Sequence, residues 1–230
     1  CLGEDRVQPV VTTGAEPNDI ERLGVIAVVR MNPLVPTELT GQLFQLAGAD
    51  CIRDGAVCLL ALRVPGAPLE LRWALMPNHY YAFTATALAH QLVLIYLQED
   101  GTWATKAIAD LGDTLPVDIS IAPDDSKIYV ASFMDGTLRV YDISNPFEAK
   151  LIEQVKLGEM ANMVSESWDG KRLYVTNSLL SKWDKPGDYW LKAYAWENGK
   201  LVHKFTTDFN SVGRAHLMNF GSKALRAKAE

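Results

Sequence analysis

The feature that most constrains the fold is a polar turn followed by a strand, which recurs along the chain. Residues 120–130 place such a turn before Lys127-Ile-Tyr-Val130, and residues 167–175 place another before Arg172-Leu-Tyr-Val175. Asp, Ser and Gly favour tight turns, and alternating β-branched and aromatic residues favour strands. Both copies are therefore predicted to be a turn that leads into a β-strand.

A second strand follows each copy. Residues 137–142 follow the first copy, and residues 189–196 follow the second after an insertion at 181–188. A weaker copy of the unit lies at residues 80–84, 91–96 and 103–109. The Tyr-containing strands recur about every 45 residues, which is the spacing of four-stranded propeller blades. The sequence thus predicts an all-β protein with a β-propeller fold.

The repeats also predict how the chain is organised. A single blade cannot bury both of its faces, so it must pack against neighbouring blades. About 160 residues at this period supply three to four blades, whereas propellers close with roughly four to eight. We expect a partial ring over residues 68–222 and a tail at 223–230. Residues 1–67 carry no copy of the repeat and are expected to form an irregular segment of their own.

Within that first segment, two apolar runs are candidate strands. They are residues 25–30 and 56–62, while residues 36–49 have apolar spacing compatible with a helix. Cys1, Cys51 and Cys58 are odd in number and contain no C-x-x-C, so they predict neither a disulfide framework nor a zinc site. Because the chain begins with Cys rather than Met, we expect a processed or open-ended N-terminus, the latter being favoured over a lipoprotein.

Composition excludes several classes of partner. The chain is 48% hydrophobic and 22% charged, which is typical of a globular protein. Its formal charge of -6 argues against nucleic acid or an anionic membrane surface as the main partner. No apolar run reaches the roughly 18 to 20 residues that cross a bilayer. We therefore expect no nucleic-acid partner and no membrane span.

Long motifs carry a family resemblance. They are residues 68–73 with 77–83, 116–121 with 135–146, 162–184, and 201–209 with 213–220. Together these segments resemble the selenium-binding protein / methanethiol oxidase family. The resemblance implies a seven-bladed propeller and, in bacterial members, a copper-dependent periplasmic oxidase. That oxidase converts methanethiol, dioxygen and water to formaldehyde, hydrogen sulfide and hydrogen peroxide.

The resemblance ends upstream of Pro68. The family carries further blades there with histidine-bearing motifs, but this chain has no His before His79. Residues 1–67 are therefore expected to be a truncated, shuffled or frame-shifted remnant. Relatives outside bacteria bind selenium through a cysteine, and none of the three cysteines here lies in a matching context, so selenium binding is not assigned to any of them.

Histidines are the candidate copper ligands, since imidazole suits copper. His216 lies inside a family motif and follows Gly213, and His79 lies at a strand entry after Pro77-Asn78. Each is interpreted as a metal ligand or as a structural His hydrogen-bonded within a blade. His203 alternates with apolar neighbours, which favours a structural role, and His90 is expected to be a solvated turn residue. We assign no catalytic residue.

This ligand set is expected to be incomplete. Two His from part of a ring supply at most part of a three- or four-ligand site. Copper binding to this chain is therefore expected to be weak, and submicromolar one-to-one binding in an equilibrium titration would contradict that. We also expect the chain by itself to be inactive.

Other chemical groups have simpler interpretations. The Asp side chains that recur at blade turns are predicted to cap those turns or to fix blade corners; they are Asp118, Asp142, Asp169 and Asp184. Ser178 and Ser181 lack a recognisable triad. Arg72 and Arg214 are either buried pairing residues or substrate-face groups. The six tryptophans are predicted to pack between blades; they are Trp73, Trp103, Trp168, Trp183, Trp190 and Trp196.

Two functions remain open from the sequence. The first is part of a copper-dependent methanethiol oxidase acting on a small thiol, with His216 and His79 as the metal ligands. The second is a non-catalytic propeller that binds a small molecule or a protein on its loop face, because the propeller fold serves both uses. Close approach of His216 and His79 on one channel-facing surface would favour the oxidase, and separation would favour the binding module.

Overall fold

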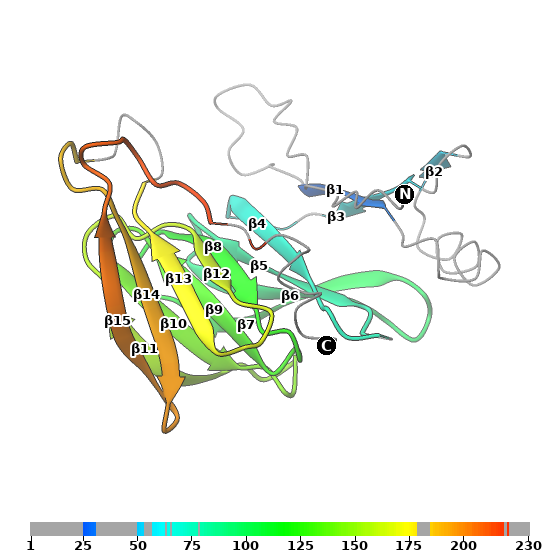
Figure 1. Ribbon diagram of the computed structural model, residues 1–230. Helices are drawn as coiled ribbons and strands as arrows, with labels where there is room; N and C mark the ends of the chain where they lie inside the picture. The colour runs from blue at the N-terminus through cyan, green and yellow to red at the C-terminus, as the bar shows by residue number, and fades with distance from the viewer. Residues whose placement is uncertain are drawn as a thin grey trace, which may run out of the picture.

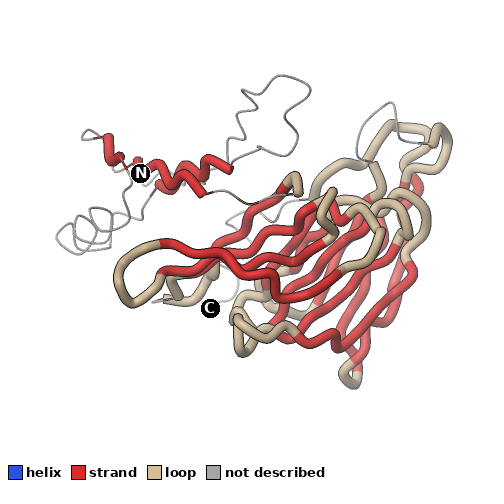
Figure 2. Tube along the Cα trace, turned by 180° about the vertical axis from the view of Figure 1, so that it is seen from behind, coloured by secondary structure: helices blue, strands red, loops and turns tan. Residues whose placement is uncertain are grey.

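The computed structural model describes residues 25–30, 50–52, 57–62, 64, 66–77, 79–178, 185–218 and 220. These residues contain strands and no helix. Three four-stranded antiparallel sheets follow one another along the chain and lie side by side (Figures 1 and 2). The predicted all-β propeller fold is therefore confirmed, with three blades in the described part of the chain. Within that part, no helix has the length and apolar character needed to cross a bilayer.

Each blade is an up-and-down sheet whose strands pair in chain order. Blade 1 contains β4 (Pro68–Trp73), β5 (Tyr81–Thr86), β6 (Gln91–Leu97) and β7 (Trp103–Asp110). Blade 2 contains β8 (Pro116–Ile121), β9 (Lys127–Ser132), β10 (Thr137–Asp142) and β11 (Lys150–Lys156). Blade 3 contains β12 (Val164–Glu166), β13 (Arg172–Thr176), β14 (Trp190–Glu197) and β15 (Lys200–Asp208).

The first strand of each blade is the inner strand. β8 lies next to β4 on one side and next to β12 on the other. Each inner strand begins where the chain arrives from the preceding blade, and it ends in the turn to its second strand. We call these the link end and the turn end. β8 has six residues, which at about 3.3 Å per residue separates its two ends by roughly 20 Å.

Apolar side chains hold the blades together face to face. Between blades 1 and 2, Phe83, Leu94 and Ile119 are fully buried. Between blades 2 and 3, Tyr129 and Leu173 are fully buried. Burying each such side chain contributes about 1.5–3 kcal/mol, so the interfaces rather than the single sheets stabilise the fold.

The prediction that the tryptophans pack between blades is confirmed for Trp190 and Trp196. Trp190 lies in the core between blades 2 and 3, with Trp196 partly buried against it. Trp73 and Trp103 meet edge to face within blade 1, with ring centroids 5.5 Å apart. Trp168 lies on the turn after β12, and Trp183 lies outside the described residues.

The N-terminal part contains a separate three-stranded antiparallel sheet in the order β1-β3-β2. Its strands are β1 (Val25–Arg30), β2 (Asp50–Ile52) and β3 (Val57–Leu62). The two predicted strands are confirmed here, and β2 was not predicted. The helix-compatible residues 36–49 lie outside the described residues.

Candidate functional site

Three polar residues occupy the same level at the link end of the inner strands. Glu70 follows a bulge after Pro68, and Asp118 follows the same bulge after Pro116. Asn162 lies in the link just before β12. Each pairs through the backbone with the fifth residue of the second strand of its blade. These pairing residues are Ala85, Ala131 and Thr176. We call Glu70, Asp118 and Asn162 the axial polar level.

Asp118 ties all three inner strands together. Its side chain is fully buried, Arg72 Nη2 on β4 lies 3.2 Å from Oδ1, and the Val164 N–H on β12 donates to Oδ2 at 2.7 Å. Arg72 also pairs with Glu70 at 2.5 Å. Burial raises the pKa of Asp118 to about 7, with Arg72 opposing that rise and Glu70 adding to it. A perturbed carboxyl in such a setting marks a functional or structural centre.

This arrangement corrects the prediction for Asp118. The residue lies on strand β8 and not at a turn, directly after the bulge at Pro116, and its carboxylate contacts Arg72 on β4 and Val164 on β12. Asp142 and Asp169 do cap turns, since their carboxylates accept the N–H groups of Ser144 and Lys171. Asp184 and Ser181 lie outside the described residues.

His216 lies at the link end beside Asn162. Its Nδ1–H donates to the Ser178 carbonyl at 2.6 Å, and the amide of Asn162 donates to the same carbonyl at 2.5 Å. In the neutral ring Nδ1 therefore carries the proton, and Nε2 keeps its lone pair. Among the residues that the structure describes, none donates a hydrogen bond to Oδ1 of the fully buried Asn162. The Ser178 carbonyl thus accepts from both side chains.

Side chains of blade 3 hold the segment that carries His216. Thr176 Oγ1 donates to the His216 carbonyl at 2.6 Å, and Ser165 Oγ donates to the Met218 carbonyl at 2.7 Å. Gly213, with φ of +116°, allows the chain to turn back from β15 onto the inner strand. The imidazole is thus positioned by contacts that are remote in sequence. Arg214 is exposed on this segment.

His79 lies at the opposite end of the inner strands. It follows β4 in the turn to β5, and its Nδ1 lies 2.7 Å from Asp125 Oδ2 in the turn after β8. The ring stacks on Tyr81 at 5.2 Å, and burial, with Asp125 adding, raises the pKa of Tyr81 to about 12. The structure therefore does not bring His79 and His216 together.

The other two histidines have local partners. His203 is exposed on β15, lies 2.9 Å from Thr206 Oγ1 and meets Tyr194 edge-on at 5.5 Å. His90 lies on the β5–β6 turn, as predicted, but is half-buried, with Nε2 3.4 Å from Asp113. Within the described ranges, no group of three or more His, Cys, Asp or Glu side chains is arranged to hold a metal ion.

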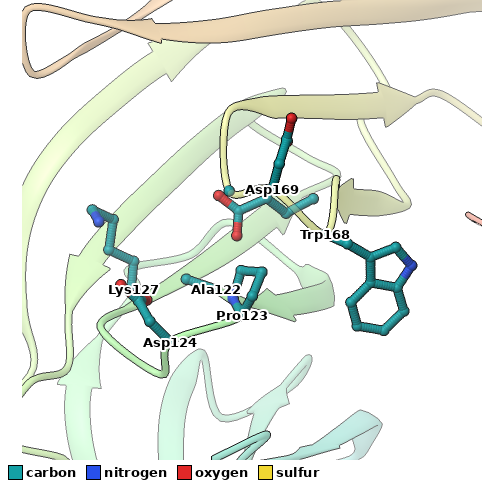
Figure 3. A pocket seen from close by; sticks show the side chains of 8 residues that line it. Ala122, Pro123, Asp124, Lys127, Trp168 and Asp169 are labelled. Carbon is teal, nitrogen blue, oxygen red and sulfur yellow. The ribbon is translucent and has the colours of Figure 1, made fainter. Parts of the chain in front are cut away.

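A pocket of about 240 Å³ opens at the turn end, between blades 2 and 3 (Figure 3). Asp124 and Lys127 line it from one blade, and Trp168 and Asp169 line it from the other. Glu166 also contributes. Its Oε1 accepts the Tyr129 hydroxyl at 2.5 Å, and burial raises the pKa of Glu166 to about 7.

These features define part of a β-propeller whose inner strands carry a polar level. A family model described as the 56 kDa selenium binding protein matches residues 62–210, which is more than half of the chain. The chain therefore belongs to the selenium-binding protein family.

Relatives within this family include two bacterial proteins named methanethiol oxidase. The protein of Hyphomicrobium sp is 51% identical over 176 residues, covering 73% of this chain and 40% of the relative. That of Ruegeria pomeroyi is 50% identical over 171 residues, covering 70% and 39%. A crystal structure of a hypothetical selenium-binding protein from Sulfolobus tokodaii matches with a TM-score of 0.59 and 26% identity, covering 67% of this chain and 44% of that one. The chain spans about two fifths of the length of these curated relatives.

Proposed function

We propose that this chain supplies the blades that carry His216 to a methanethiol oxidase. The observation that carries the proposal is that about half of the aligned residues, 176 and 171 in number, are identical to those of two bacterial proteins of that name. The reaction would convert methanethiol, dioxygen and water to formaldehyde, hydrogen sulfide and hydrogen peroxide. This transfers two electrons from the methyl carbon to dioxygen, which calls for a redox cofactor.

Copper is the cofactor that the family resemblance implies, and His216 fits a copper ligand. The Ser178 carbonyl fixes the imidazole so that Nε2 remains the donor atom, which is the usual arrangement of a metal-binding histidine. Beside it lies Oδ1 of buried Asn162, which receives no hydrogen bond from the described part of the chain and is a further polar group at that position. When bound, copper would accept electrons from the thiol and pass them to dioxygen.

The rest of the proposed site lies beyond His216. The described residues hold no set of three ligands, so further ligands would come from outside them. In this chain, Asn162 and Ser178 would orient the imidazole, and Asp118 with Arg72 would hold the inner strands at a fixed spacing. We assign His79 no place in this copper site, because it lies at the turn end.

A hybrid protein tests the proposal. In the Hyphomicrobium relative, the 176 matched residues would be replaced by those of this chain, and copper would be supplied. We expect the hybrid to produce hydrogen peroxide in proportion to the methanethiol consumed, because its blades carry the same site. The unmodified relative is the positive control, and circular dichroism reports folding. A folded hybrid that binds copper as the relative does but forms no peroxide would overturn the proposal.

Small-molecule binding without catalysis is a second candidate function. The observations that favour it are the separation of His79 from His216 and the pocket of about 240 Å³ at the turn end. In that case the hybrid would fold and remain inactive with every level of copper. The same assay therefore separates the two functions.

A further inference from the structure

The turn between β4 and β5 presents two metal-binding side chains to solvent. Met76 and His79 are three residues apart, and the His79 N–H donates to the Met76 carbonyl at 3.4 Å. Met76 is 43% exposed, and the His79 side chain is 41% exposed. A thioether and an imidazole are therefore both open to solvent on one short turn. The proposed oxidase site at the link end does not use either residue.

A single buried carboxylate holds this turn in place. Asp125, whose side chain is 2% exposed, accepts the N–H groups of Leu75 at 2.7 Å and Met76 at 2.9 Å. The same carboxylate lies 2.7 Å from His79 Nδ1. Since a carboxylate only accepts, Nδ1 carries the proton in the neutral ring, and Nε2 then keeps its lone pair. Asp125 thereby fixes the backbone beside the Met76 thioether and the tautomer of His79 together.

The chemistry of the two free donors is selective. A thioether is a soft ligand that prefers Cu(I), and imidazole binds copper in either oxidation state. Cu(I) also accepts low coordination numbers, so two side chains on one turn suffice to hold it. A carboxylate that accepts the other N–H of a ligating imidazole is the usual outer partner in metal sites, where it orients the ring and raises its basicity.

We propose that Met76 and His79 form a surface site for Cu(I), with Asp125 as its positioning residue. This site is separate from the proposed oxidase centre at His216 and does not depend on it. With two ligands exposed to solvent, it would bind Cu(I) reversibly and exchange it readily. The chemistry suits an ion that is taken up or handed on at the turn end of the propeller.

Competition for Cu(I) tests this site on the chain itself. The chain would be titrated without oxygen against a chromophoric Cu(I) chelator such as bicinchoninate. We expect Met76→Leu and His79→Gln each to weaken Cu(I) binding at least about tenfold, because each removes one of two ligands. Asp125→Asn should weaken it by about tenfold or more, as outer-partner substitutions do. Circular dichroism would confirm that each variant keeps its β-sheet signal.

Matched variants act as controls. Met134→Leu changes a methionine that is 68% exposed, and His203→Gln changes an exposed histidine; neither should alter Cu(I) affinity. Ag(I), a diamagnetic substitute for Cu(I), should shift the NMR signals of the Met76 methyl group and His79 Nε2. The proposal is overturned if either Met76→Leu or His79→Gln leaves Cu(I) affinity unchanged, or if Ag(I) shifts His216 instead. Because no peroxide assay is involved, failure here leaves the proposed oxidase function standing.

Discussion

Replacing Asp118 with alanine is expected to destabilise the folded chain by about 1–3 kcal/mol, the usual cost of leaving a buried hydrogen-bond donor without its acceptor. The substitution leaves Arg72 without its buried partner and the Val164 N–H without an acceptor. Because these groups belong to three different blades, the loss would loosen both blade interfaces at once. Equilibrium unfolding in urea, with the free energy extrapolated to water, measures the effect.

Two further variants serve as comparisons for the stability of Asp118→Ala. Asp142→Ala removes an exposed turn cap and should cost about 1 kcal/mol or less. Asp118→Asn keeps an acceptor for the Val164 N–H but removes the charge opposite Arg72, so its cost should be intermediate. An Asp118→Ala variant no less stable than Asp142→Ala would show that Asp118 does not join the blades.

Replacing Gly136 with alanine is the second change with a large expected effect. Gly136 has φ of +56°, and a Cβ there would lie 2.0 Å from the Gly158 carbonyl oxygen. The left-handed conformation costs a residue with a Cβ about 1–2 kcal/mol, and relieving the backbone clash should add about 1–3 kcal/mol. The Gly136 carbonyl also accepts the Leu157 N–H at 2.9 Å, so the clash would disturb the link that leads into blade 3.

Gly199 provides the matched control for this substitution. It has φ of +77°, but nothing lies within 4 Å of the position of its Cβ. Gly199→Ala should therefore show only the conformational cost. Urea unfolding of both variants separates the two contributions, and equal losses of stability would mean that the approach of Gly136 to Gly158 is not restrictive.

Much of the fold could be predicted because its determinants are local. Alternation of apolar residues and the turn residues at 124–126 and 169–170 specify both a strand and where it reverses. The insertion before β14 was predicted because the repeat resumes after it. Strand β2 was not predicted, since three residues are too few to show a period.

The candidate site was predicted only in part. The family motif singled out His216, but its position depends on contacts with Thr176 and Ser178, which lie 40 and 38 residues away in sequence. Asp118 was taken for a turn residue because a bulge leaves no mark in the apolar pattern. A signal was nevertheless present: Pro-x-acid occurs at Pro68-Leu-Glu70 and again at Pro116-Val-Asp118, a spacing of 118 − 70 = 48 residues. A repeat of that kind places both acids at one level of neighbouring blades.

Separation of the two imidazoles could not be predicted from sequence. His79 and His216 both lie within family motifs, and nothing in the motifs indicates at which end of a strand each will lie. The two imidazoles are separated because the inner strands all run from the link end to the turn end. His79 follows the end of β4, whereas His216 contacts the residues before β12 and after β13. The two histidines are thus assigned to different sites.

The proposed copper site depends on His216 at the link end, and the hybrid with the Hyphomicrobium relative tests that role most directly. Methanethiol-dependent peroxide formation would be compared between the hybrid, its His216→Ala variant and its His203→Ala variant, with copper content measured for each. We expect peroxide formation by the His216→Ala hybrid to fall to the rate of buffer alone, with loss of copper. The His203→Ala hybrid should keep the rate of the unsubstituted hybrid. Full activity in a folded His216→Ala hybrid would contradict that role.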